Sequence, residues 1–147
     1  FLMAKKNASR GGQYPIVAEF TFDAAHDTMK NVSGMEEGFG TAGAHVFDII
    51  NFPSGGIVVS GEVVTELAVS GSTAYKVKVG DAQKADRYLV ETDRVAAGVT
   101  PLVPTGFVSN GDQIRLTVTP TGAATAGKVT VRVCYIVRNR VNEVQTH

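Results

Sequence analysis

The residues best suited to chemistry stand together near the start of the chain: Asp23, His26 and Asp27. Side chains spaced i, i+3 and i+4 can converge on a divalent cation or supply a general base. The same residue types at the end of a strand more often cap a turn. No further ligand motif accompanies them, so we expect a turn cap here and no metal site.

A second pair, His45 and Asp48, falls within one predicted strand. Successive side chains of a strand point to opposite faces, so residues three apart diverge. We therefore expect no catalytic dyad at this position.

Further acids recur near predicted strand ends, namely Asp81, Asp86, Asp93 and Asp112. Their spacing lacks the EF-hand calcium pattern, so they are interpreted as turn residues. No Gly-rich phosphate loop precedes a helix, and no nucleophile elbow is found. The sequence thus predicts no enzyme and no cofactor.

The strongest structural pattern lies near the C-terminus, where apolar and polar residues alternate over residues 113–119 and again over 128–138. A period of two gives each segment one face for a core and one for water. The connection, 120–127, is small and rich in Gly, which is typical of a turn. We expect one long hairpin.

Other strands are expected wherever the same alternation recurs between turn signals. They cover residues 16–22, 46–50, 57–69, 74–79 and 85–91. For residues 85–91 a single helical turn is the alternative. Residues 99–108 contain two prolines and are expected to be irregular or an edge strand. Gly61 inside its strand predicts a bulge, a bend or a close approach of backbone.

About eight strands and no helix of ordinary length predict an all-β fold, an antiparallel β-sandwich of the jelly-roll type. The domain is expected to cover residues 14–138. Residues 1–13 are expected to be a flexible arm and 139–147 a C-terminal tail.

Residues 23–45 carry Met29, Met35 and Phe39 without strand periodicity. A long irregular excursion is usually functional or packed onto the body. One alternative is an Ω-like loop whose Met and Phe side chains cover the core. The other is a contact surface, since adaptable Met and Phe side chains suit binding.

The net charge is zero, with 14 basic and 14 acidic side chains, which argues against nucleic acid as the main partner. No apolar run approaches the roughly 18 residues of a membrane span. The charge is uneven, however: basic at the N-terminus, acidic over 19–48 and basic again after 115. This suits contacts between subunits, or it is self-neutralising surface charge.

Several segments together resemble a known family. They are 46–62 (VFDIINFPSGGIVVSGE), 77–81 (VKVGD), 88–93 (YLVETD), 112–122 (DQIRLTVTPTG) and 126–136 (AGKVTVRVCYI). In strand texture and turn placement they are similar to the jelly-roll decoration, or cement, proteins of tailed bacteriophage heads.

The resemblance implies a mechanical role on the outer surface of the virion, after synthesis in the host cytoplasm. Such proteins bind the shell of major capsid protein and stabilise it against the pressure of the DNA. Self-association as a dimer or trimer is implied, and the family has no catalytic residues to carry over. The expected contact residues are Lys5, Lys6, Arg10, Met29, Met35, Phe39, Arg138 and Arg140.

Two alternatives stay open. One is a receptor- or glycan-binding module of a phage tail fibre, against which the absence of Trp speaks, because sugar platforms favour large flat rings. The other is a small cupin-like enzyme, which would need several His ligands. Only His26 and His45 precede the tail.

Overall fold

The computed structural model describes residues 14–138, and within this range every regular element is a β-strand. The strands are β1 (Ile16–Asp23), β2 (Thr28–Lys30), β3 (Glu36–Gly38), β4 (His45–Ile50), β5 (Gly56–Ser70), β6 (Ala74–Gly80), β7 (Leu89–Asp93), β8 (Gly98–Pro101), β9 (Ile114–Thr121) and β10 (Ala126–Val137).

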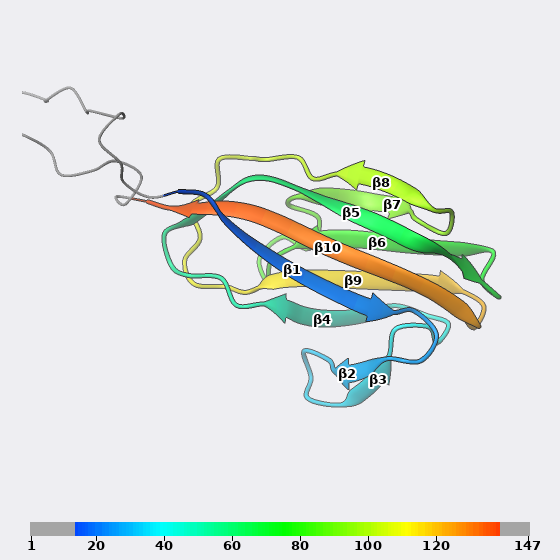
Figure 1. The fold of residues 1–147 in the computed structure, drawn as a ribbon. Helices are drawn as coiled ribbons and strands as arrows, with labels where there is room; N and C mark the ends of the chain where they lie inside the picture. Colours follow the sequence, from blue (N-terminus) through cyan, green and yellow to red (C-terminus); the bar gives the residue numbers. More distant parts are fainter. Residues whose placement is uncertain (1–13, 139–147) are drawn as a thin grey trace, which may run out of the picture.

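Eight of these strands form two antiparallel four-stranded sheets, ordered β1-β10-β5-β8 and β4-β9-β6-β7, which pack face to face (Figure 1). The remaining pair, β2 and β3, forms a small sheet of its own. Along the chain the eight strands mostly alternate between the two sheets, and this order is that of a jelly roll. The predicted all-β sandwich is confirmed.

The expected hairpin of 113–119 with 128–138 is wrong, although both segments are strands. β9 pairs with β4 and β6, whereas β10 pairs with β1 and β5. The connection between them therefore crosses from one sheet to the other. Both strands still bury one face, because each lines the same core from its own sheet, and a period of two does not distinguish that arrangement from a hairpin.

The core lies between the sheets. Val129, Val131 and Val133 of β10 are fully buried, and so are Leu116 and Val118 of β9. Full burial of one such side chain contributes about 1.5–3 kcal/mol. The alternation seen in the sequence is what places these side chains on the inner faces.

An aromatic cluster closes the core near the end of β1. The Phe39 ring lies 4.2 Å from that of Phe22 and 4.3 Å from that of Phe47, measured between centroids. The buried hydroxyl of Tyr75 donates a 2.7 Å hydrogen bond to the carbonyl oxygen of Phe39, and burial raises the pKa of Tyr75. Phe39 is thereby fixed by both its ring and its backbone.

Gly61 is a point of close approach, as its place in the strand predicts. A Cβ atom there would lie 2.5 Å from the carbonyl oxygen of Arg132 and 2.7 Å from Cδ1 of Leu102. The register of β5 against β10 also shifts between Val58 and Ser60. Because Gly61 has no side chain, Leu102 can pack against β5 at this point and close the edge of the core.

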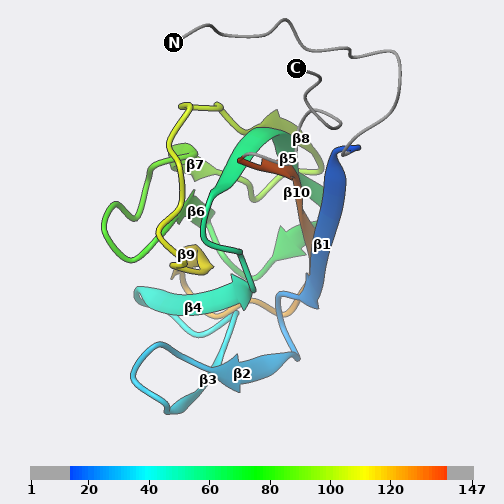
Figure 2. The same cartoon turned by 90° about the vertical axis from the view of Figure 1, so that its left-hand side faces the viewer.

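Residues 23–45 are more regular than expected, because β2 and β3 pair within them (Figure 2). Between these strands Asn31 caps the turn, and its Oδ1 accepts hydrogen bonds from the backbone N–H groups of Ser33 and Met35. Three-residue strands carry too little alternation to be recognised in the sequence. We call residues 28–38 the hairpin lobe.

Two weaker expectations are partly corrected. The strand expected at 85–91 begins only at Leu89, because residues 81–88 form a tight connection. The edge expected within 99–108 is the short strand β8, which pairs with β5 on one side.

Candidate contact surface

The trio Asp23, His26 and Asp27 is a turn cap, as expected. Asp23 Oδ1 accepts hydrogen bonds from the backbone N–H groups of Ala25 and His26, and Asp27 Oδ2 accepts one from the N–H of Asp23. The bond from Ala25 is the main cause that lowers the pKa of Asp23. The carboxylates thus satisfy the backbone at the end of β1.

His45 and Asp48 have different partners and form no dyad. His45 is buried, and its Nδ1 lies 2.9 Å from Oε2 of Glu37. Asp48 instead accepts a 3.0 Å hydrogen bond from Nε of Arg115 on the neighbouring strand. The two side chains thus diverge, as expected for residues three apart in a strand.

Asp81 is a turn residue with a role that its spacing did not reveal. Its Oδ1 accepts the backbone N–H groups of Gln83 and Lys84, and its Oδ2 lies 2.6 Å from Nε of Arg87. The Arg87 guanidinium also stacks over the ring of Phe107 at 3.5 Å. This buried ion pair holds the connection from β6 to β7 against the segment before β9.

No cluster of three or more His, Cys, Asp or Glu side chains in residues 14–138 is arranged to hold a metal ion. In the same part of the chain no helix is long and apolar enough to cross a membrane.

The three expected contact residues of the excursion have different surroundings. Phe39 is buried in the aromatic cluster, so in this fold its side chain offers no surface to a partner. Met29 is half-buried against the core, while Met35 is 68% exposed at the tip of the hairpin lobe. Phe39 and Met29 thus cover the core, and of the three only Met35 is left largely exposed.

The other expected contact residues come from the first and last parts of the sequence. Arg138 is exposed, and its backbone N–H bonds to the carbonyl oxygen of Gly55. Lys5, Lys6, Arg10 and Arg140 lie outside the described residues.

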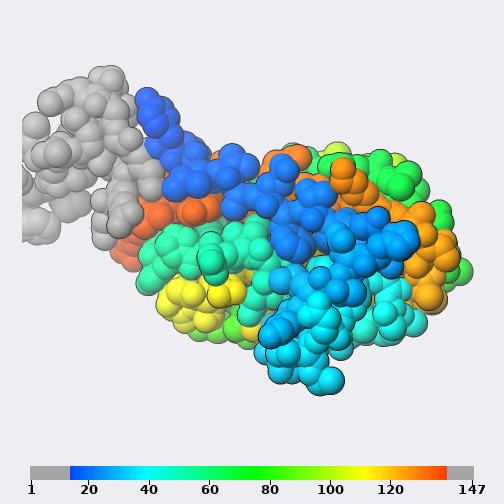
Figure 3. Space-filling view, turned by 60° about the horizontal axis from the view of Figure 1, so that its bottom comes forward, coloured from blue at the N-terminus to red at the C-terminus, as the bar shows by residue number. Residues whose placement is uncertain are grey.

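The hairpin lobe is the main projection from the sandwich (Figure 3). Its exposed apolar side chains are Met35 and Val32, and Val32 also donates its backbone N–H to the carbonyl oxygen of Val46 on β4. Thr28 and Glu36 are linked across the lobe by a 3.0 Å hydrogen bond. The lobe therefore presents an exposed apolar tip, and hydrogen bonds hold its base.

The outer face of the β1-β10-β5-β8 sheet carries a charge ladder that single-strand patterns do not reveal. Arg132 on β10 lies 2.7 Å from Glu19 on β1 and 3.3 Å from Glu62 on β5. The register places these three residues in one row across the sheet. Val17, two residues before Glu19 on β1, is also exposed.

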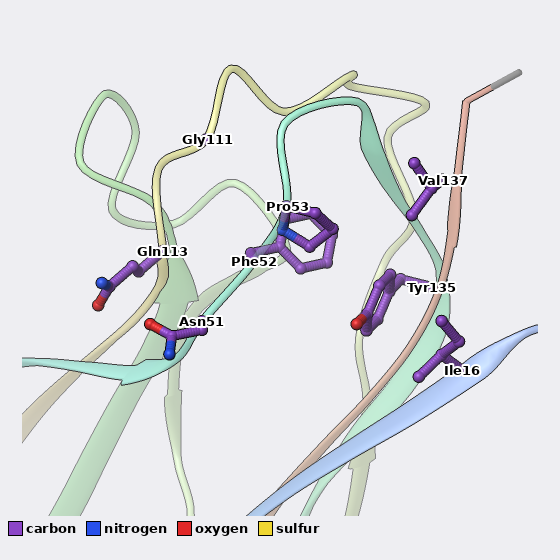
Figure 4. A pocket seen from close by; sticks show the side chains of 8 residues that line it. All are labelled: Ile16, Asn51, Phe52, Pro53, Gly111, Gln113, Tyr135 and Val137. Carbon is purple, nitrogen blue, oxygen red and sulfur yellow. The ribbon is translucent and has the colours of Figure 1, made fainter.

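A groove of about 540 Å³ opens at the end of the sandwich where β1 begins and β10 ends (Figure 4). Its floor includes Phe52 and Tyr135, whose rings meet edge to face with centroids 4.8 Å apart. Tyr135 is half-buried, and part of its ring faces the groove. The lining residues are Ile16, Asn51, Phe52, Pro53, Gly111, Gln113, Tyr135 and Val137.

The sequence matches no family model and no curated protein. Solved structures with a similar fold come from phage capsids. A chain of the capsid asymmetric unit of cyanophage Pam1 aligns with a TM-score of 0.62 at 19% identity, over 93% of each chain. A chain of the acidic stable capsid of Helicobacter pylori bacteriophage KHP30 aligns with a TM-score of 0.59 at 15% identity, over 90% of this chain and 92% of that one. At these identities the likeness is one of fold.

Proposed function

We propose that this chain is a structural protein of a bacteriophage capsid, and that it acts as a decoration protein bound outside the shell of major capsid protein. The observation that carries the proposal is the likeness of its fold to two chains from phage capsids, which extends over at least 90% of each chain. The resemblance of its sequence segments to cement proteins supports the finer assignment.

The body of the protein suits a mechanical role. Two sheets enclose a continuous core, and such interiors are close-packed and hardly compressible. Charged side chains on the outer face are paired across strands rather than gathered around a cavity. In this role the protein transmits load between neighbouring shell subunits and resists the pressure of packaged DNA.

The surface offers more than one point of attachment. Met35 and Val32 project on the hairpin lobe, beside the end of β1, whereas Tyr14 and Ile16 are exposed at the beginning of β1. Contacts at both ends of one body allow a copy to bridge two neighbours. Many weak contacts over a lattice then add up to firm attachment, and pairing of copies into dimers or trimers strengthens it further.

The proposal is tested with phage heads that lack decoration. We expect the purified protein to co-sediment with them and to raise the temperature at which they release DNA. Met35→Glu should weaken both effects, because it puts a charge on the apolar tip. Val90→Glu is the matched control, since Val90 is 64% exposed on β7, away from the lobe.

Failure of the unmodified protein to bind such heads would remove the decoration role. Equal loss with Met35→Glu and Val90→Glu would keep the role but exclude the hairpin lobe as the contact.

A further inference from the structure

Each sheet of the sandwich ends in two edge strands, and three of these four edges are protected against pairing with a further strand. On β4, the carbonyl oxygen of Val46 accepts a hydrogen bond from the hairpin lobe. β8 has only four residues and ends in Pro101, which has no N–H group to offer. β7 pairs irregularly with β6, because the register shifts between Val77 and Val79. Short strands, prolines and bulges are the usual protection of a sheet edge.

The fourth edge, β1, has none of these features. It runs for eight residues, Ile16–Asp23, contains no proline and pairs with β10 without a register shift. Within residues 14–138 no strand pairs with its other side. Figure 3 shows β1, in dark blue, at the surface above the hairpin lobe. A long, regular edge of this kind is a template for a further strand.

The backbone groups on the free side of β1 can be assigned from the hydrogen bonds at its end. The N–H of Ala24, one residue past β1, bonds to the carbonyl oxygen of Gly127 on β10. Because these directions alternate along a strand, the odd-numbered residues of β1 turn their N–H and C=O groups away from β10. At Asp23 both groups are already used, since Asp27 accepts from its N–H and donates to its carbonyl oxygen. The outward groups without a partner in the described residues belong to Val17, Glu19 and Thr21.

The side chains of β1 suit a second copy of the same strand. On the inner face, Ala18 and Phe20 are only partly buried against the core, and Ile16 is 41% exposed. On the outer face, the carboxylate of Glu19 lies 2.7 Å from the guanidinium of Arg132 on its own sheet. A second copy would thus cover apolar side chains and would meet a carboxylate that is already paired.

Charge selects the register of such a pair. In an antiparallel arrangement centred on Glu19, the two Glu19 side chains would stand directly opposite each other, and like charges in that position are destabilising. When the pair is centred on Ala18, Glu19 instead faces Val17 of the second copy. Ile16 then covers the partly exposed ring of Phe20, and the outward backbone groups of Val17 and Glu19 bond to each other across the interface.

We propose that β1 is the site at which two copies of this chain pair edge to edge, antiparallel and centred on Ala18, so that their β1-β10-β5-β8 sheets become continuous. The inference goes beyond the proposed capsid role, because it names the surface through which copies pair. It is tested on purified protein without phage heads, so either proposal can fail alone. A single paired edge is a small contact, and we therefore expect weak association in solution.

The first test measures disulfide formation between copies of the full chain. Cys134 is the single cysteine and is first replaced by Ser. In the proposed register Ala18→Cys places two thiols opposite each other, with Cα atoms about 4.5 Å apart, which a disulfide can span. The control is Val99→Cys on the β8 edge, where the side chain is 57% exposed and more accessible than at Ala18. We expect dimers of Ala18→Cys to form at least about tenfold faster, because pairing raises the effective concentration.

The second test changes the charge that faces Glu19. In the Ala18→Cys protein, Val17→Lys should speed cross-linking and Val17→Glu should slow it, with rates that differ by about threefold at low salt and converge as salt rises. Both changes remove the same exposed apolar side chain, so each is the control for the other.

Three results would overturn the proposal. The first is cross-linking of Ala18→Cys that is no faster than that of Val99→Cys. The second is cross-linking that is fastest at Glu19→Cys, with equal effects of the two changes at Val17, which would exclude the register centred on Ala18. The third is cross-linking of Ala18→Cys to a shell protein on phage heads with none between copies, which would assign the edge to that partner.

Discussion

Glu37 on β3 and His45 at the start of β4 are joined by a hydrogen bond of 2.9 Å, which ties the hairpin lobe to the sandwich. The second ring nitrogen of His45, Nε2, lies 2.7 Å from the carbonyl oxygen of Thr41. The imidazole ring is thus held between a carboxylate and a backbone carbonyl. His45 therefore contacts both Glu37 of the hairpin lobe and the segment that leads into β4.

Acidification should loosen the hairpin lobe. Hydrogen bonds from Asn31 and then His45 hold the pKa of Glu37 below its ordinary value. A carboxyl whose pKa is lowered by folding stabilises the fold above its unfolded pKa, and this stabilisation is lost as the pH falls through the lowered value. Protection factors of the backbone amides in residues 28–38 should thus decrease in acid, measured by hydrogen exchange. The Glu37→Gln variant should lack this decrease in protection. If the variant responds to acid as the unmodified protein does, another group causes the decrease.

Removal of the Asp81 carboxylate should strongly destabilise the protein. Asp81→Ala leaves the guanidinium of Arg87 without its ion-pair partner and two backbone N–H groups without an acceptor. Breaking a buried pair in this way costs about 3–5 kcal/mol. Urea unfolding measures the loss. Asp112→Ala is the control, since its side chain makes no hydrogen bond within the described residues, and a similar loss there would contradict the assignment.

A methyl group at Gly61 should not fit. The added Cβ would lie 2.5 Å from a backbone oxygen, so β5 or β10 must move, at a cost of about 1–3 kcal/mol in the free energy of unfolding. Gly38→Ala is a matched control in another strand, because its Cβ meets Thr41 Oγ1 at an ordinary 3.5 Å. Thermal unfolding of the two variants distinguishes them, and equal melting temperatures would show that the close approach at Gly61 is readily relieved.

The charge ladder should make a small contribution to the stability of the protein, and this contribution should depend on salt. Arg132→Gln leaves Glu19 and Glu62 in one row without the cation between them. These side chains are more than a third exposed, so the expected loss of stability is small at low salt, and it should shrink as ionic strength rises. Arg138→Gln, which removes an exposed cation with no ion pair in the described residues, should change stability little at any salt concentration. A loss with Arg132→Gln that does not depend on salt would point to packing by the Arg132 stem instead.

The sequence was informative about the faces of individual strands. Val129, Val131 and Val133 alternate with polar residues, and the structure buries all three. The partner of each strand was not predictable, because the same alternation suits a hairpin and a crossover between sheets. The misplaced pairing of β9 with β10 has this cause.

The contact surface was harder to predict than the fold. The ladder from Glu19 to Arg132 joins residues that are far apart in the chain, so only the register of the strands brings them together. The groove has the same origin, since its walls come from β1, β10 and two connections. Phe39 and Met35 are chemically similar candidates in the sequence, and burial alone separates them.

Ile16 and Tyr135 are register partners on adjacent antiparallel strands, so the described chain enters and leaves the sandwich at one pole. Tension applied through both ends would separate β1 from β10 one hydrogen-bonded residue pair at a time. This is the direction in which a sheet resists force least. Forces delivered to the flanks of the body would instead have to slide whole strands past one another. A protein built like this can be tethered by its ends but should carry mechanical load through its sides, and pulling single molecules from the two directions would show the difference in rupture force.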